Sequence, residues 1–368
     1  MIEWFFKYGS VILLFNTILL NIDQEMIDYQ YVFYFTMSIS LLFMMVNIVN
    51  VSNVILHKAF NFLFFLNLIN LIHFLFFSWD YVGDIASHPF LYLIAKFLQY
   101  TLISLSIYYN INYFRDKFFN HIIYLISATV FLGFVINFNA SFESYQGLFK
   151  NQNMLASLTG IAFSILLLKG NKSTVFQIGL LSLLFFVSVL SGSRSVFIYI
   201  AIALLYKYGF SIKNFIYAFL VVGILLLMQH RIFVDDIDRL DQWSESIENI
   251  NDEFLTGYGL SVYEGYLEDN ESYGGAHNAY LSILMLYGVI LGSFVIMSIL
   301  IKSYFLYSFF KKPSSDVRIY LCIVMITLIA SISETLITGV NEFLTILFWI
   351  SLSSLSFIKY KLQHNESI

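Results

Sequence analysis

The sequence predicts an all-α protein, a polytopic membrane helix bundle of about 12 transmembrane helices with one long extracytoplasmic loop. Hydrophobic residues make up 59% of the 368 residues and charged residues only 12%, which excludes a soluble domain with an ordinary charged surface. The apolar residues form continuous runs of about 20 residues, the length that crosses a bilayer as a helix. Lipid offers no hydrogen-bond partner to exposed backbone, so helices are the expected form of these runs.

The runs follow one another as a single membrane domain in three parts. Residues 1–229 are expected to hold transmembrane helices 1–9, residues 230–276 a polar loop with a short helical segment, and residues 277–368 transmembrane helices 10–12 and a tail. The first run lacks a small-residue cleavage site after Leu20, which indicates a retained helix rather than a removed signal peptide. The runs are residues 8–22, 31–49, 59–78, 90–109, 121–139, 153–169, 174–191, 195–210, 213–229, 277–301, 318–337 and 341–358.

Lys and Arg residues are unevenly distributed between alternate connections, and this asymmetry predicts the orientation. With a cytoplasmic N-terminus, the inner connections hold Lys7, Lys58, Arg115, Lys117, Lys169, Lys172, Lys207, Lys213, Lys302, Lys311, Lys312, Arg318, Lys359 and Lys361. The outer side is left with Lys96, Lys150, Arg194, Arg231 and Arg239. Both termini are therefore expected in the cytoplasm and the 230–276 loop on the extracytoplasmic side. The single cysteine, Cys322, lies in an apolar run, so no intramolecular disulfide can form.

Arg194 is the most informative of the outer cations. It lies in a Ser-Gly-Ser-Arg-Ser stretch, residues 191–195, where one apolar run ends and the next begins. A guanidinium stays protonated and its fork of donors fits a phosphate bidentately, so this position suggests an anionic ligand. The distance from Arg194 to Lys207 is only about 20 Å along a helix, short of the roughly 30 Å hydrocarbon core. Either Lys207 snorkels or Arg194 lies in a polar cavity, and an interfacial arginine at a helix end also fits.

Two further ionisable residues lie at the ends of predicted spans. His277 precedes a long apolar run, where the helix dipole favours the neutral imidazole that a general base needs. The simpler interpretation is a histidine that helps to start a helix at the interface. Glu334, near the outer end of the eleventh run, needs a partner or a wet cavity, and Arg194 is the expected partner.

The polar loop carries many acidic residues against only two arginines, Arg231 and Arg239. A cluster at Asp235, Asp236 and Asp238 has the chemistry of a divalent-cation site, but a solvated acidic surface is the simpler interpretation. Residues 235–250 have a helical pattern, with an apolar face formed by Ile237, Leu240, Ser244, Ile247 and Ile250. Trp243 is suited to stacking on a sugar ring, and packing of the loop onto the membrane surface fits equally well.

Four motifs, in order, resemble the O-antigen ligase and polymerase superfamily of bacterial membrane glycosyltransferases. The resemblance runs from about Gly147 to the C-terminus. The motifs are Gly147, Phe149, Asn151 and Asn153; the Ser191-Gly192-Ser193-Arg194 turn; Arg239 and Trp243 followed by Gly257-Tyr258-Gly259; and His277-Asn278-Ala279-Tyr280-Leu281 followed by Tyr287-Gly288 and Gly292. The chain departs from the family where an acidic residue usually precedes the last glycine block, since Leu286-Tyr287 stands there.

The resemblance implies transfer of a glycan from undecaprenyl diphosphate to an acceptor hydroxyl on the extracytoplasmic face. It assigns Arg194 to the diphosphate leaving group and His277 to the acceptor hydroxyl. Arg239 or Arg231 becomes a second phosphate contact. The remaining expected substrate-binding residues are Glu334, Asn278, Tyr280 and Trp243. The reaction needs a fixed cation and a neutral base, and the resemblance implies neither a metal nor another cofactor.

The expected function is repeat-unit polymerisation of O-antigen, capsule or exopolysaccharide in the bacterial cytoplasmic (inner) membrane. The alternative is an O-antigen ligase that delivers the chain to the lipid A core, because donor and fold are shared. A transporter or flippase for lipid-linked sugars is the alternative from another class. The expected partners are the lipid-linked oligosaccharide, the glycan acceptor, the lipid bilayer and a chain-length regulator, and no nucleic acid.

Overall fold

The protein is described here from a computed structural model. It describes residues 2–22, 29–79, 89–137, 145–169, 174–217, 220, 223, 235–260, 277–311, 313–340 and 342–364. Within these ranges the regular secondary structure is helical, and the one β-type pairing is an isolated antiparallel bridge between Ile22 and Phe149. The predicted all-α class is confirmed for this part of the chain.

The helices follow the predicted apolar runs closely. In chain order they are α1 (Ile2–Leu20), α2 (Tyr29–Val46), α3 (Ile48–Ile55), α4 (Asn61–His73) with the π-helical turn η1 (Phe74–Ser78), α5 (Pro89–Tyr109), α6 (Ile111–Asp116), α7 (Phe118–Ile136), α8 (Gln152–Lys169), α9 (Val175–Leu190), α10 (Ser195–Tyr208), α12 (Asp235–Asp252), α13 (Ala279–Phe309), α14 (Ser315–Ala330) and α15 (Phe343–Gln363).

The apolar helices indicate a membrane protein. Six described segments are long and apolar enough to cross a bilayer, namely Asn61–Ser78, Pro89–Tyr109, Phe118–Ile136, Gln152–Lys169, Ala279–Phe309 and Phe343–Gln363. A further candidate is the pair α2 and α3, which is bent by 92° close to where the predicted run at 31–49 ends. Three other apolar helices are shorter, α9 and α10 among them. The run at 213–229 lies mostly outside the described residues, so the count of about 12 spans stays a prediction.

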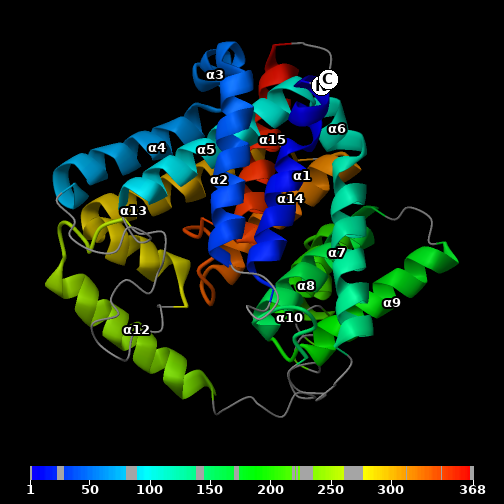
Figure 1. Cartoon of the computed structure of the whole chain (residues 1–368). Helices are drawn as coiled ribbons and strands as arrows, with labels where there is room; N and C mark the ends of the chain where they lie inside the picture. Colours follow the sequence, from blue (N-terminus) through cyan, green and yellow to red (C-terminus); the bar gives the residue numbers. More distant parts are fainter. Residues whose placement is uncertain are drawn as a thin grey trace.

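The core of the bundle is built around α15, of which 89% is buried, against 33% for α13. This helix packs against α14 and α5, while α10 packs against α8 and α14. Figure 1 shows α15 surrounded by α1, α5 and α14. Buried hydroxyl residues on α15 bond to its own backbone, for example Ser351 to the Leu347 carbonyl at 2.7 Å. Such small residues let neighbouring helices approach closely without a strong hydrophobic driving force between them.

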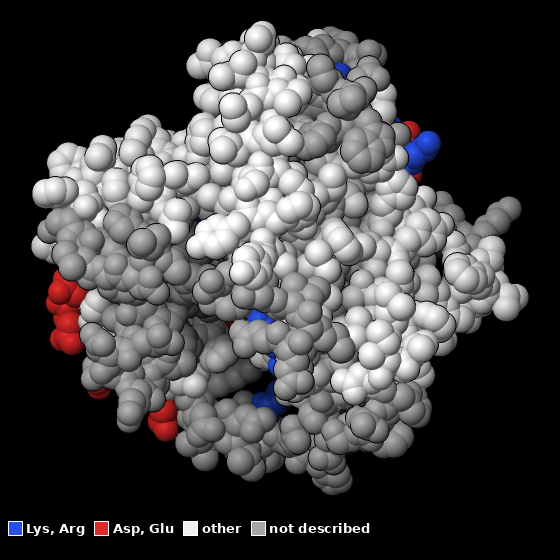
Figure 2. All heavy atoms as spheres, in the orientation of Figure 1, with Lys and Arg blue, Asp and Glu red and all other residues white. Residues whose placement is uncertain are grey.

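Charged groups are sparse on the face that Figure 2 shows. Acidic atoms lie at the left edge, where Figure 1 places α12, and basic atoms lie inside a hollow in the lower half of the view. Most of the remaining described surface on this face carries no charge. An uncharged belt with ionisable groups in a hollow fits a protein that surrounds a polar site with lipid-facing helices.

Candidate functional site

The turn at residues 191–194 joins α9 to α10 and places Arg194 at the N-terminal end of α10. Arg194 is the residue that caps α10, and it is partly buried. The turn is fixed by its serines, since the Ser191 hydroxyl donates to the Ser188 carbonyl at 2.7 Å and the Ser193 and Ser195 hydroxyls lie 2.9 Å apart. The guanidinium is therefore mounted on a rigid turn at the positive end of a helix dipole, an arrangement suited to an anion.

Below Arg194 on the same helix, Tyr199 is fully buried and connects three parts of the protein. Its hydroxyl lies 3.3 Å from that of Ser157 on α8, and it also hydrogen-bonds Ser195. The carboxylates of Glu334 and Glu342 both interact electrostatically with this hydroxyl. The two carboxylates come from a segment more than a hundred residues away, and the predicted pairing of Glu334 with Arg194 stays a prediction.

That segment, residues 331–342, corrects a prediction. The apolar run at 318–337 was expected to be one helix, but α14 ends at Ala330, and the described residues 331–340 and 342 form no regular helix. Leu336, Ile337 and Val340 are buried, so the irregular backbone lies inside the protein. Irregular backbone at membrane depth is tolerated only where protein or a water-filled cavity surrounds it, because its carbonyls need donors.

Donors from three helices satisfy these carbonyls. The backbone amide of Ala279, at the start of α13, donates to the carbonyls of Ser331 at 2.8 Å and of Glu334 at 3.1 Å. From α5, Lys96 donates to Gly339 at 2.8 Å and Gln99 donates to Val340. The Thr345 hydroxyl of α15 donates to Leu336 and also to the Glu342 carboxylate, the latter at 2.9 Å. The segment that carries both glutamates is therefore held on all sides by the bundle.

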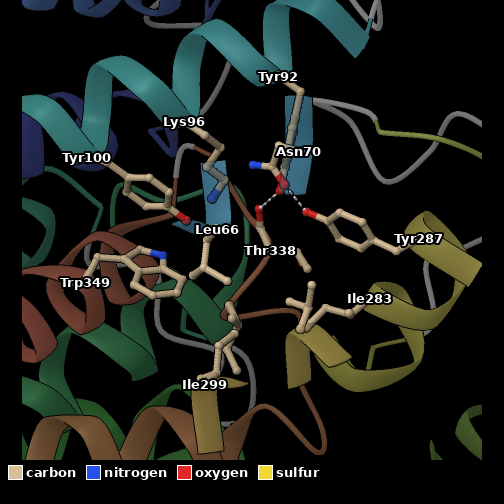
Figure 3. A pocket seen from close by; sticks show the side chains of 12 residues that line it. Leu66, Asn70, Tyr92, Lys96, Tyr100, Ile283, Tyr287, Ile299, Thr338 and Trp349 are labelled. Carbon is tan, nitrogen blue, oxygen red and sulfur yellow. Dashed lines mark hydrogen bonds between the residues drawn. The ribbon is translucent and has the colours of Figure 1, made fainter. Parts of the chain in front are cut away.

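Lys96 is a site residue that sequence analysis missed. Its charge was assigned to the outer connections, but the side chain is only 1% exposed and lies within α5. The ammonium group is 5.5 Å from the centre of the Tyr92 ring, in a cavity of about 30 Å³ that Figure 3 shows between α4, α5, α13 and α15. The signal was present in the sequence, because a lysine inside an apolar run is a functional candidate by default.

The same cavity contains a chain of polar groups. The Tyr287 hydroxyl of α13 donates to the Asn70 side-chain oxygen of α4 at 2.5 Å, and the Tyr92 hydroxyl donates to the Thr338 carbonyl at 3.4 Å (Figure 3). Both tyrosines point toward Asn70 in that view. This network, together with Lys96, connects α4, α5 and α13 to the irregular segment that carries Glu334 and Glu342.

His277 lies immediately before α13. Its φ of 41° is the one positive value among the described non-glycine residues and lies near the left-handed region, which few residues other than glycine adopt. The next residue, Asn278, caps the helix, because its side-chain oxygen accepts from the amides of Tyr280 at 2.9 Å and Leu281 at 3.2 Å. The Tyr280 hydroxyl donates to the Leu328 carbonyl of α14 at 2.7 Å. Asn278 and Tyr280 thus fix the position of His277, and their contacts with substrate stay predictions.

The two glycine motifs meet each other. Helix α13 is broken at Gly288, where φ is 74°, and residues 254–259 fill the break. The amide of Tyr258 donates to the Met285 carbonyl at 2.8 Å, and the amide of Val289 donates to the Phe254 carbonyl at 2.8 Å. A Cβ on Gly288 would lie 2.3 Å from the Leu255 carbonyl oxygen, so only glycine fits. The described end of the polar loop is thereby fixed to α13, the helix that follows His277.

His73 of α4 also contacts residues 254–259. We call the packing of these residues into the break of α13 the glycine junction. The Nε2 atom of His73 lies 2.8 Å from the Thr256 carbonyl, and its Nδ1 atom lies 3.4 Å from the Ser78 hydroxyl. Ser78 belongs to the π-helical turn η1, and such turns occur often at functional sites. Because His73 packs edge-on against Tyr287, with 5.4 Å between the ring centres, the glycine junction and the Lys96 cavity share one wall.

The predicted residues of the loop are only partly described. The helix expected at 235–250 is confirmed as α12, which packs against α13 (Figure 1). Its buried face differs from the predicted one, since Ile247 is 50% exposed while Ser246, Asn249 and Ile250 are buried. Trp243 is half-buried on α12. Arg231 lies outside the described residues, and for Arg239 and the Asp235, Asp236 and Asp238 cluster only the backbone is described.

Three of the predicted site residues lie at or near helix ends, and Glu334 interacts with two of these helices. Arg194 begins α10, His277 precedes α13, and Glu334 is bonded to the first turn of α13 and interacts with Tyr199 of α10. The described residues contain no group of three or more His, Cys, Asp or Glu that could hold a metal ion. No family model matches the chain, and no curated protein sequence is significantly similar to it.

Proposed function

We propose that the protein is a polyprenyl-diphosphate-dependent glycosyltransferase that polymerises repeat units of O-antigen, capsule or exopolysaccharide. The main support is that Glu334 accepts a hydrogen bond from the first residue of α13, two residues after His277, and interacts electrostatically with Tyr199 of the helix that follows Arg194. Displacement of a diphosphate by a hydroxyl requires a cation that stabilises the leaving group and a neutral base that accepts the proton of the hydroxyl. Arg194, at a helix N-terminus, and His277 have this chemistry. The proposal includes a bundle of about 12 spans in the bacterial cytoplasmic membrane, with Arg194 and His277 on the extracytoplasmic side.

In the proposed reaction the anomeric carbon of the lipid-linked glycan exchanges one oxygen partner for another. The bond to the diphosphate oxygen breaks, and undecaprenyl diphosphate leaves with the electron pair, stabilised by Arg194 and by Arg239 or Arg231. The acceptor hydroxyl forms the new bond, and its proton passes to the imidazole of His277. Glu334 orients Arg194 or a sugar hydroxyl, while Asn278, Tyr280 and Trp243 line the acceptor side.

The test is polysaccharide production in cells that carry single variants. Arg194→Ala and His277→Ala are each expected to lower the amount of long-chain polysaccharide about 100-fold or more, while the protein stays in the membrane. Lys58→Ala and His364→Ala change an exposed lysine and an exposed histidine elsewhere, and they are expected to leave chain length unchanged. Wild-type chain lengths in both site variants would refute the proposal.

Arg194→Lys tests the guanidinium itself. Lysine keeps the charge but not the planar fork, so this variant is expected to lose most of its activity if the diphosphate is bound bidentately. If Arg194→Lys retained most of its activity, bidentate binding of the diphosphate would be excluded. The positive charge at this position alone would then be sufficient.

A deletion strain separates the polymerase from the ligase. Loss of a polymerase leaves a single repeat unit on the acceptor, whereas loss of a ligase leaves none. A flippase makes a third prediction, because its loss traps the lipid-linked repeat unit in the cytoplasmic leaflet. The proposed catalytic residues Arg194 and His277 lie at the starts of α10 and α13 rather than within these helices, which favours an enzyme over a transporter.

A further inference from the structure

A second hollow lies at the opposite end of the helices that carry the candidate site. It has a volume of about 640 Å³, within the range of ligand-binding sites. It lies between the end of α10, the end of α13 and the start of α14, and α10 packs against α14. Arg194 lies at the start of α10 and the hollow lies at the end of the same helix. The two are therefore separated by the length of α10, about 20 Å.

The hollow is strongly cationic. Lys207, Lys311 and Arg318 line it, and its described lining contains no acidic residue. The nearest acidic residue in sequence, Asp316, interacts instead with Lys169 and Arg115. Three cations gathered in one hollow repel one another, and an anion placed among them removes this repulsion. The Arg318 fork suits a phosphate, and the hydroxyls of nearby tyrosines add donors.

An apolar stripe leads from the membrane-facing side of α13 to this hollow. Its members recur every three or four residues, as on one face of a helix, and all are exposed: Ile290, Phe294, Met297, Ile301 and Tyr304. Tyr304 is 67% exposed and also lines the hollow, so the stripe and the cationic lining are continuous. A free phosphate would use only the lining, whereas an anionic amphiphile would use both.

We propose that this hollow binds the headgroup of an anionic phospholipid, with the phosphate between Lys311 and Arg318 and the acyl chains along the exposed stripe of α13. Basic pockets between transmembrane helices are suited to such headgroups. The site is independent of the proposed glycosyltransferase activity. It would fix the ends of α10, α13 and α14 relative to one another at the membrane surface.

The test uses the full chain purified in a neutral detergent and measures retention of added lipid by native mass spectrometry. The probes are phosphatidylglycerol, phosphatidylcholine and inorganic phosphate. Wild type is expected to retain phosphatidylglycerol at least tenfold more than phosphatidylcholine, and millimolar inorganic phosphate is not expected to displace it. The variant with both Lys311→Gln and Arg318→Gln is expected to bind phosphatidylglycerol about tenfold to thirtyfold more weakly.

Two further variants make the result decisive. Lys213→Gln removes an exposed cation just beyond α10 that does not line the hollow, and it is expected to bind as wild type does. Lys311→Gln alone changes an exposed side chain, so the fold is expected to be retained and binding to weaken by about fivefold. Equal retention of both lipids, displacement by inorganic phosphate, or unchanged binding in the double variant would each overturn the proposal.

Discussion

The side chain of Lys96 supports the backbone segment that carries Glu334 and Glu342. It is buried in α5, yet its ammonium group donates to the carbonyl of Gly339, in the same irregular segment as Glu334 and Glu342. An ideal Cβ on Gly339 would lie 2.6 Å from a Glu342 carboxylate oxygen, so the carboxylate packs directly against this glycine. The position of Lys96 thus fixes the backbone beside at least one of the acidic groups that face Tyr199.

Replacing Lys96 by methionine keeps the volume but removes this donor. The Gly339 carbonyl then loses a partner in a buried environment, which costs about 1–3 kcal/mol. We expect Lys96→Met to lower the Tm of the purified protein by several degrees and to lower polysaccharide production, as measured by thermal unfolding and by chain-length analysis. Lys58→Met, at an exposed position, should change neither. An unchanged Tm in the Lys96 variant would contradict the supporting role.

Some residues of the candidate site could be predicted from the sequence and others could not. Arg194 and His277 stood out because they lie at the ends of apolar runs, where charge is unusual and helix dipoles act. Lys96 was missed because it was counted for topology and not for its place seven residues into α5. Tyr199 could not be found from the sequence, since a tyrosine in an apolar helix gives no sign of a hydrogen bond to Ser157 or of an electrostatic interaction with Glu334 and Glu342.

At the scale of elements, the bounds of most helices were predictable and the breaks were not. Apolar runs define α5, α8 and α15 to within a few residues, because membrane length and hydrophobicity alone specify them. The break in α13 and the irregular segment 331–342 depend on contacts from distant parts of the chain. A weak local signal existed, since Ile337, Thr338, Gly339 and Val340 are poor helix formers in sequence.

The glycine junction makes a prediction at this scale. Gly288→Ala would place a Cβ 2.3 Å from the Leu255 carbonyl oxygen, and Gly257→Ala would place one 2.4 Å from the Gly288 amide nitrogen. Both glycines also have positive φ, at 74° and 65°, which alanine adopts only with strain. We expect either change to release residues 254–259 from α13 and to increase protease cleavage of the loop in the purified protein.

Gly179→Ala is the matched control for the junction. A Cβ there meets nothing within 4 Å, and the residue lies inside α9, so the change is expected to be neutral or to stabilise the helix by about 0.5–1 kcal/mol. Protease sensitivity equal to wild type in the Gly257 and Gly288 variants would show that the junction does not fix the loop.

At the scale of the whole molecule, the candidate site and the cationic hollow lie at opposite ends of the same helices. Helices α10 and α13 begin just after Arg194 and His277 and end at the hollow, while α14 begins at the hollow. The positive-inside rule predicts that the hollow, with Lys207, Lys311 and Arg318, faces the cytoplasm. One orientation of the chain would therefore place the proposed glycan transfer on the extracytoplasmic side and the proposed lipid site on the cytoplasmic side.

This orientation can be tested by cysteine labelling, because the native Cys322 is buried and only 1% exposed, so it should not react. Ser244→Cys adds a thiol at an exposed position of α12, and Lys213→Cys adds one at an exposed position after α10. We expect a membrane-impermeant maleimide to label Ser244→Cys in intact spheroplasts but to label Lys213→Cys only after the membrane is permeabilised. Labelling of Lys213→Cys from outside, with protection of Ser244→Cys, would invert the chain and place Arg194 and His277 on the cytoplasmic side, where an extracytoplasmic glycan transfer could not occur.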